Sequence, residues 1–382
     1  MSAEIKVLEV GPGNFGKGGI SVIAWRWYSK FDQKKFTVDF ASAISPEKKY
    51  TDIIKSNGGE FYCIASVKNK IIKQFEKVSR LRKIVKKNQY DCIHIHADNA
   101  FTMAVFYFAV RKYCDNIIIH AHSTGIDGGS TKKNFLMNFK RFLHGLCRPL
   151  IRGKNAAYLA CSDAAAKWLF PAGIYKTRRF TVIANGIETH KFAYDPNIRN
   201  EVRKALSITD KFVIGNVGRF SYPKNHDFLI DIFEEVYKRN NSAVLLLIGR
   251  GELEEKIKNK VSVLGLDKAV IFYGTSSDVH KLYQAMDCFV FPSHFEGLGM
   301  AAIEAQAAGL KTICADTIPE EAKITELFEY MSLNDPAEKW ADKLLSCNNG
   351  YERKDMSDEI DKKGYNILQS AKQIEELYLK KY

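Results

Sequence analysis

Short apolar runs alternate with stretches of helical length along almost the whole chain. One series of expected strands covers 5–10, 37–41, 92–96, 116–120 and 157–161, and a second covers 212–217, 243–248, 270–272, 288–291 and 312–315. Such alternation is typical of parallel sheets that carry helices on both faces. Because the pattern restarts near Lys211 after a turn-rich stretch, the sequence predicts an α/β protein with two doubly wound, Rossmann-like domains.

The two halves of the chain also differ in charge. Residues 1–190 hold 31 Lys and Arg against 14 Asp and Glu, whereas the remainder holds 26 against 30. The sequence therefore predicts an N-terminal domain over 1–190, a linker over 191–210, a C-terminal domain over 211–362 and a terminal helix over 363–382.

Cysteine usage and hydropathy restrict the compartment. The eight cysteines form no Cys-x-x-Cys pair, which argues against a zinc site and favours a reducing compartment. The chain leads directly into an apolar run without a signal-peptide pattern, and its longest apolar stretch, 100–110, is about half a membrane span. We therefore expect a cytoplasmic protein that is at most peripheral at the inner face of the cell membrane.

A glycine-rich loop, Gly11-Pro-Gly-Asn-Phe-Gly16-Lys-Gly18-Gly19, follows the first expected strand. It matches the G-x-G-x-x-G pattern of dinucleotide sites, and Asp39 lies in the next strand, so an NAD-dependent oxidoreductase is one hypothesis. However, the loop continues through two further glycines, which disfavour a helix. Its backbone N–H groups suit a phosphate or a sugar equally well, and a plain glycine-rich turn is a third interpretation.

Loops that follow expected strands in the second half carry a different set of polar residues. Arg219 and Lys224 can clamp a diphosphate through a guanidinium fork and an ammonium group. Glu296 precedes a small-residue helix whose N-terminus favours an anion, and Glu304 lies inside that helix. Either carboxylate can accept hydrogen bonds from sugar hydroxyls. Viewed singly, Glu296 could instead complement the helix dipole, and Glu304 could be a surface acid.

Together these residues resemble the signature of family 4 of the retaining glycosyltransferases, which have the GT-B fold. The matching segments, in order, are Gly18-Gly19, 91–96, 160–163, 182–187, Gly218-Arg219 with Lys224-Asn225, 248–251, 272–274, 285–287 and the pair Glu296 and Glu304. The resemblance implies an active site in the cleft between the domains, with the terminal helix packed back on the N-terminal domain.

The resemblance also implies roles for single residues. His122, Glu296, Arg219 and Lys224 are the expected catalytic residues. The expected donor site comprises Gly18, Gly19, Arg219, Lys224, Asn225, Gly249, Glu296, Gly297, Leu298, Gly299, Met300 and Glu304. In it Arg219 and Lys224 bind the diphosphate, Glu304 the ribose and Glu296 the transferred sugar. His122 best matches the family's sugar-contacting histidine; His120 is the competing assignment, and His96 is expected beside them at the acceptor and sugar.

The implied reaction moves a hexose from a nucleotide diphosphate sugar to a glycan acceptor with retention of configuration. A UDP-sugar is expected, although Thr275-Ser-Ser277 replaces a basic residue that often borders the base in the family. No metal or other cofactor is expected, because cationic side chains and a helix N-terminus can stabilise the leaving diphosphate. A non-catalytic nucleotide-sugar-binding protein is the further alternative.

The basic N-terminal half bears on the acceptor. Residues 68–87 contain nine Lys and Arg and one acid, Glu76, which suits either a solvated helix face or an anionic membrane surface. The apolar stripe expected to face inward comprises Ile71, Phe75, Val78, Leu81 and Val85. A polyprenyl-linked glycan acceptor in capsule or exopolysaccharide biosynthesis fits this charge. No nucleic-acid-binding motif is present, so nucleic acid is not an expected partner.

Overall fold

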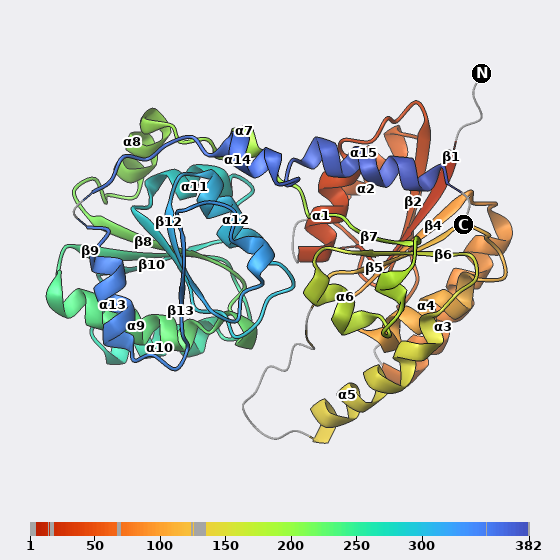
Figure 1. Cartoon of the computed structure of the whole chain (residues 1–382), viewed down its shortest axis with the longest axis horizontal. Helices are drawn as coiled ribbons and strands as arrows, with labels where there is room; N and C mark the ends of the chain where they lie inside the picture. Colours follow the sequence, from red (N-terminus) through yellow and green to blue (C-terminus); the bar gives the residue numbers. More distant parts are fainter. Residues whose placement is uncertain are drawn as a thin grey trace. The chain divides into compact units, whose positions relative to one another are not determined.

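The computed structural model describes residues 5–380 except 14, 16–18, 67–69, 124, 126–134 and 349. Two compact units divide this chain. Unit 1 takes its described residues from the region up to 187 and from 366–380, and unit 2 comprises 188–365. Each unit is built on one parallel sheet with helices on both faces, as Figure 1 shows. The expected fold class of two Rossmann-like sheets is therefore confirmed.

Unit 1 contains a seven-stranded sheet in the order β3-β2-β1-β4-β5-β6-β7. Its strands are β1 (Ile5–Val10), β2 (Phe36–Ser42), β3 (Phe61–Cys63), β4 (Cys92–Ala97), β5 (Ile117–Ala121), β6 (Ala156–Ala160) and β7 (Phe180–Val182). Its helices are α1 (Gly19–Tyr28), α2 (Lys48–Ser56), α3 (Lys70–Lys87), α4 (Ala100–Val110), α5 (Phe135–Cys147), α6 (Asp163–Leu169) and α15 (Ile367–Tyr378), with 3-10 turns η1 (Arg148–Ile151) and η2 (Ile174–Lys176). The strand order reverses between β1 and β4.

Unit 2 contains a six-stranded sheet in the order β10-β9-β8-β11-β12-β13. Its strands are β8 (Phe212–Val217), β9 (Ala243–Ile248), β10 (Val270–Gly274), β11 (Cys288–Phe291), β12 (Lys311–Ala315) and β13 (Phe328–Met331). Its helices are α7 (Thr189–Phe192), α8 (Pro196–Ala205), α9 (His226–Arg239), α10 (Glu254–Val263), α11 (Val279–Ala285), α12 (Met300–Ala307), α13 (Ala337–Leu345) and α14 (Ser357–Lys362), with 3-10 turns η3 (Tyr222–Lys224) and η4 (Glu320–Ala322). Here the order reverses between β8 and β11.

Local sequence signals start several of these helices. The side chain of Asn99 accepts a hydrogen bond from the backbone N–H of Thr102 at 2.9 Å and so caps α4. Ser162 caps α6 in the same way. Asp195 caps α8, and Pro196 occupies the first turn of that helix, where its missing N–H is harmless.

The stretch 188–205, most of which was expected as linker, is folded into unit 2 as α7 and α8. Two arginines of α8 fix it there: Arg199 and Arg203 both pair with Asp287, which precedes β11. A second carboxylate oxygen of Asp287 accepts the backbone N–H of Val213 in β8 at 2.7 Å. Ion pairs therefore help to attach α8 beside β11, and no local pattern in the sequence shows that Arg199 and Arg203 meet Asp287.

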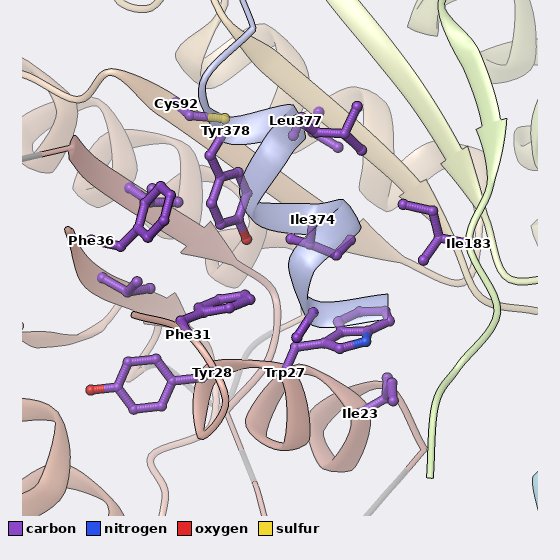
Figure 2. Close-up of a cluster of buried hydrophobic side chains, with 14 of the residues drawn as sticks. Ile23, Trp27, Tyr28, Phe31, Phe36, Cys92, Ile183, Ile374, Leu377 and Tyr378 are labelled. Atoms are coloured by element: carbon purple, nitrogen blue, oxygen red, sulfur yellow. The ribbon is translucent and has the colours of Figure 1, made fainter. Parts of the chain in front are cut away.

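Helix α15 completes the core of unit 1, although it follows unit 2 in the chain. Figure 2 shows Ile374, Leu377 and Tyr378 lying against side chains of α1, β2 and the strands behind. Ile374 is fully buried, whereas Leu368 on the opposite face is 60% exposed. The indole N–H of Trp27 in α1 also donates to the Ser370 hydroxyl at 2.9 Å.

Helix α3 departs from its expected orientation in its first half. Leu81 and Val85 are buried as predicted, but Phe75 is 74% exposed, so the prediction that it faces inward is wrong. Ile71 lies outside the residues whose side chains are described. In the parts of the chain that the structure describes, no helix is both long and apolar enough to span a bilayer.

Replacing Ile374 with Ala should lower the free energy of unfolding by about 2–5 kcal/mol, because it opens a cavity where α15 meets α1 and the sheet. Leu368→Ala, on the exposed face of the same helix, should change it by less than about 0.5 kcal/mol. Denaturant titration of both variants checks this. Equal losses for the two would contradict the assigned packing face.

Candidate functional site

The loops that follow β8 and β11 meet at the edge of the unit 2 sheet. Successive connections run to opposite sides from these two neighbouring strands, and ligands of doubly wound sheets bind at such a point, beyond the carboxyl ends of the strands. The backbone N–H of His294 donates to the carbonyl of Pro223 at 2.7 Å, and the rings of Tyr222 and His294 stack at 4.7 Å. The two loops therefore form one connected structure.

An ion pair joins the same two loops. The Lys224 ammonium lies 2.6 Å from Oε1 of Glu296, and the side chains are only 20% and 12% exposed. The ammonium also lies 4.7 Å from the centre of the Phe291 ring, a cation–π contact at the end of β11. Two residues expected to bind different parts of one ligand are thus placed in direct contact.

The other cationic residue of this site is more open to solvent. Arg219 pairs with Glu252 through its Nε and a terminal nitrogen at 3.1 and 2.9 Å, and its side chain is 65% exposed. Gly249 brings the loop after β9 against the loop after β8: its φ is +147°, and a Cβ there would lie 1.9 Å from the carbonyl oxygen of Gly218. Asn225 adopts a left-handed conformation (φ 52°) at the start of α9.

Helix α12 begins directly after Gly299, whose φ of +89° disfavours any residue with a side chain. The donor-site segment expected from the sequence, Gly297 to Met300, therefore lies at the N-terminus of this helix, where backbone N–H groups lack helical acceptors. Leu298 is buried and anchors the segment.

Glu304 is only 6% exposed, so the alternative that it is a surface acid is wrong. The Tyr283 hydroxyl lies 3.2 Å from Oε2 of Glu304 and 3.1 Å from the carbonyl oxygen of Ala301. Tyr283, on α11, was not identified from the sequence. Its position within an ordinary amphipathic helix carries no signal that distinguishes it from a core aromatic.

Unit 1 holds a second cluster, in the sheet where its strand order reverses. Four histidines come from two neighbouring strands: His94 and His96 from β4, His120 at β5 and His122 directly after it. Residues two apart on a strand point to the same face, so each pair lies on one side of the sheet. His96 Nδ1 lies 2.8 Å from His122 Nε2, and His94 Nε2 lies 3.1 Å from His120 Nδ1.

One carboxylate and one phenol complete this histidine cluster. Glu9 of β1 is 2% exposed; its Oε2 accepts from His96 Nε2 and its Oε1 accepts from the hydroxyl of Tyr378 on α15. Neither residue was among the predicted site residues. Glu9 could have been noticed in the sequence, because Glu9 and Lys6 are the charged residues of an otherwise apolar strand, 5–10. No pattern in the sequence links Tyr378 to Glu9.

Burial keeps most of these imidazoles neutral. It lowers the pKa of His94 to about 4 and holds the pKa values of His120 and His122 well below the ordinary range. For Glu9, burial opposes ionisation, but His94 and His96 and their hydrogen bonds outweigh it and lower the pKa of the carboxyl. His120 is fully buried, whereas His122 is partly exposed.

Three of these histidines, His94, His96 and His120, offer nitrogens within 4.8 Å of one another, which is compatible with a bound metal ion. In the structure, however, both ring nitrogens of His94 and of His96 already form hydrogen bonds. Their partners are Glu9, Tyr378 and the neighbouring imidazoles. A metal ion would have to displace these contacts.

A dinucleotide site next to the glycine-rich loop would need a carboxylate that is available to bind a ribose, and Asp39 was the predicted candidate. Asp39 is buried, accepts the Tyr90 hydroxyl at 2.7 Å and the backbone N–H of Glu60 at 2.8 Å, and is thereby engaged within the protein. Gly19 is the first residue of α1, and Gly18 lies outside the described residues.

Comparison with known proteins identifies the family. Residues 17–191 match Glycosyltransferase Family 4, and residues 197–365 match Glycosyl transferases group 1. The Bacillus subtilis protein named 'Putative glycosyltransferase EpsF' is 31% identical over 348 residues, which are 90% of this chain and 88% of EpsF. The chain is a family 4 glycosyltransferase. Members of this family are retaining enzymes that use nucleotide-sugar donors, as the motifs predicted.

One further relative and one solved structure extend the comparison of this family 4 glycosyltransferase. The Escherichia coli UDP-Gal:alpha-D-GlcNAc-diphosphoundecaprenol alpha-1,3-galactosyltransferase is 25% identical over 341 residues, 86% of each chain. The crystal structure of Anabaena HepE in complex with UDP-glucose matches with a TM-score of 0.75 at 18% identity, covering 98% of this chain and 99% of HepE. The latter likeness confirms the GT-B fold.

The buried histidines of this glycosyltransferase make its stability depend on pH. An unfolded imidazole titrates near about 6.5, whereas burial lowers the pKa to about 4 for His94 and to about 3 for His226 of α9. Between these values the unfolded chain binds more protons than the folded chain, so the free energy of unfolding must fall as the pH falls. His120 and His122 act in the same direction.

Denaturant midpoints should therefore be lower at about pH 5.5 than at about pH 7.5, with a loss of about 1 kcal/mol for each such histidine. A midpoint that stays constant over the range would show that the buried imidazoles are not held neutral.

Proposed function

We propose that this glycosyltransferase moves a hexose from a UDP-sugar to a lipid-linked glycan acceptor in the synthesis of a surface polysaccharide. The observation that carries the proposal is the position of Lys224, Glu296 and the N-terminus of α12 at the strand-order reversal of unit 2. The donor and acceptor classes are supported by the names of the E. coli galactosyltransferase and of HepE with UDP-glucose.

The proposed diphosphate site uses Lys224, Arg219 and the backbone of Gly297 to Met300 at the N-terminus of α12. Negative charge grows on the diphosphate as the glycosidic bond breaks, and preorganised cations and N–H dipoles stabilise that charge. Glu296 holds the Lys224 ammonium 2.6 Å away in a partly buried position. Its second oxygen is suited to accept a hydroxyl proton of the transferred sugar. This arrangement supplies positive charge from the chain itself.

The proposed nucleoside site centres on Glu304. A carboxylate can accept both hydroxyls of a ribose, and burial strengthens such charge-assisted hydrogen bonds. Tyr283 lies within hydrogen-bonding distance of one oxygen of Glu304 and is therefore suited to orient it. Asn225 and Gly249 are proposed to shape the adjoining loops, because both adopt backbone conformations that few residues favour.

In unit 1 we assign the sugar contact to His122. It is the partly exposed member of the histidine cluster, whereas His120 is fully buried and stacks on Trp27 at 5.4 Å. His96 is also buried and is assigned a supporting position behind His122 rather than a direct acceptor contact.

Retention requires that the new bond form on the face from which the old bond leaves. In the front-face course we propose, the bond between the anomeric carbon and the diphosphate oxygen breaks, and the acceptor oxygen bonds to that carbon on the same face. The acceptor's hydroxyl proton passes to the departing diphosphate. Lys224 and Arg219 stabilise the diphosphate during this exchange.

The membrane side of the proposal is supported by α5 and η1, which expose a row of apolar side chains that we call the α5 ridge. The ridge comprises Phe139 (47% exposed), Phe142 (65%), Leu146 (58%) and Leu150 (48%). Lys140 and Arg141 are exposed within the same helix. Apolar side chains beside basic ones favour the interface of an anionic bilayer. We therefore propose that unit 1 docks at the cytoplasmic face of the membrane, where a lipid-linked acceptor would lie.

Binding measurements separate the two halves of the proposed donor site. Lys224→Met should weaken the binding of both UDP and inorganic pyrophosphate by about tenfold or more, because it removes a partly buried cation from the proposed diphosphate site. Glu304→Gln should weaken the binding of UDP to a similar extent and leave the binding of pyrophosphate almost unchanged. Titration calorimetry measures both, with the exposed Lys268→Met as a control that removes the same charge elsewhere in unit 2. Equal effects of Glu304→Gln on the two ligands would contradict the nucleoside assignment.

Turnover decides between an enzyme and a nucleotide-sugar-binding protein. Purified protein is incubated with UDP-glucose, UDP-galactose, UDP-N-acetylglucosamine or GDP-mannose and with undecaprenyl-diphosphate-linked sugars, and products are separated by chromatography. We expect transfer from one UDP-sugar, with the donor's anomeric configuration retained in the product's NMR spectrum. UDP binding without transfer to any of these acceptors would favour the non-catalytic alternative.

The α5 ridge has its own test in vesicle sedimentation. Phe142→Ser should reduce binding to vesicles that contain phosphatidylglycerol by about tenfold or more, because burial of one Phe contributes about 1.5–3 kcal/mol. Replacing Lys140 and Arg141 with Gln should remove about 1 kcal/mol per residue and reduce the dependence on salt. Val263→Ser, at an 86% exposed position of unit 2, is the matched control. If that control lowers binding as much as Phe142→Ser, the ridge is not the membrane contact.

A further inference from the structure

The proposed function uses one member of the histidine cluster, but five further polar groups surround it. They are Glu9, His94, His96, His120 and Tyr378, contributed by β1, β4, β5 and α15. All are almost fully buried. Buried polar groups of this kind must satisfy one another's hydrogen bonds, so the position of each proton can be deduced from the contacts.

The first chain of hydrogen bonds runs from Glu9 through His96 to His122. A carboxylate only accepts, so His96 must donate from Nε2. A neutral imidazole has a single N–H, so His96 Nδ1 then accepts, and the N–H that it receives belongs to Nε2 of His122 at 2.8 Å. The remaining nitrogen of His122, Nδ1, carries no proton.

The second chain runs from the other oxygen of Glu9. Tyr378 donates its hydroxyl proton to Oε1 of Glu9, so its oxygen accepts from His94 Nδ1 at 3.0 Å. His94 Nε2 is therefore unprotonated and accepts from Nδ1 of His120 at 3.1 Å. The remaining nitrogen of His120, Nε2, carries no proton.

Both chains thus end on an unprotonated imidazole nitrogen. Within the described part of the structure, neither His122 Nδ1 nor His120 Nε2 has a hydrogen-bond partner, although both atoms are buried. A buried acceptor without a donor is costly, which favours a donor supplied from outside the protein. His122 is the member with partial exposure, so it is the one that a ligand hydroxyl can approach.

We propose that Glu9 is a positioning residue that acts through two hydrogen-bond chains to fix His122 as the Nε2–H tautomer, whose bare Nδ1 accepts a hydroxyl proton of the bound sugar. The sugar contact rests on the proposed function, whereas the tautomers do not. These tautomers require neutral rings. Burial favours the neutral form of three of them, because it lowers the pKa of His94 to about 4 and holds the pKa values of His120 and His122 well below the ordinary range. The neutral form of His96 is part of the proposal. The Glu9 carboxylate then determines which nitrogen carries the proton in each of the four histidine rings.

Nitrogen-15 NMR of the histidine-labelled full chain reads the tautomers directly. We expect His96 and His122 as Nε2–H forms and His94 and His120 as Nδ1–H forms, with assignments from single His→Asn variants. A protonated Nδ1 on His122 would overturn the proposal, as would a cationic His96 ring. A simultaneous shift of His94, His96 and His120 on addition of Zn²⁺ alone would overturn it in favour of a metal site.

A matched pair of variants tests the link to catalysis. Glu9→Gln presents an N–H₂ group in place of one carboxylate oxygen, so at least one chain loses its acceptor and reverses or breaks. Tyr378→Phe removes a hydroxyl from the same cluster, but His94 Nδ1 lies 3.3 Å from Oε1 of Glu9 and can donate to it directly. Tyr378→Phe should therefore keep all four tautomers, and its melting temperature should fall about as much as that of Glu9→Gln.

We expect Glu9→Gln to lower kcat by about tenfold or more, with a smaller change in the KM for the donor, because a misoriented group costs rate more than binding. Tyr378→Phe should lower kcat clearly less. Equal losses in the two variants, or an unchanged kcat in Glu9→Gln with altered tautomers, would overturn the positioning role. Absence of transfer by the unmodified protein, with the expected tautomers present, would instead contradict the proposed function alone.

Discussion

Parallel strand pairing determines where chemistry can occur in both units. Every strand is paired in parallel with its neighbours, so all strand ends of one kind gather at one edge of each sheet. The two strands at which the order reverses send their connections to opposite sides, and the space between those connections is open to side chains. In unit 2 that position is held by Lys224 and Glu296. In unit 1 the strands at the reversal, β1 and β4, carry Glu9, His94 and His96.

The two units use opposite electrostatic arrangements at equivalent places. Unit 2 keeps formal charges: a partly buried ammonium and carboxylate in contact, and a more exposed guanidinium nearby. Such groups suit a ligand that itself carries charge, because the ligand replaces the solvent that they lose. Unit 1 buries its polar groups almost completely, and one carboxylate, Glu9, accepts hydrogen bonds from the His96 imidazole and the Tyr378 hydroxyl. Such a network discriminates by hydrogen-bond direction rather than by charge, which suits uncharged hydroxyl groups.

The sequence predicted the strands of both sheets where apolar runs are continuous. The bounds of β1, β8, β9 and β11 agree with the predicted strands, and α15 lies within the expected terminal helix. The short strands β3 and β7 were missed. Each pairs over only three residues at an outer position of the sheet, and none of those residues is buried. Phe75 was misplaced because helical periodicity identifies a face but does not show where the helix leaves the body of the protein.

The site residues show the same limit. Motif spacing indicated Lys224, Glu296 and Glu304, because strand ends and a helix start are visible in the sequence. Tyr378 and Glu9 are 369 positions apart and share a hydrogen bond, which no local pattern reveals. That bond has a consequence for biosynthesis. Because α15 follows unit 2 in the chain, the ribosome has made all of unit 2 before unit 1 can close its core, so unit 1 must remain open during that interval. Unit 2, whose described residues are made as one continuous stretch, is free to fold first.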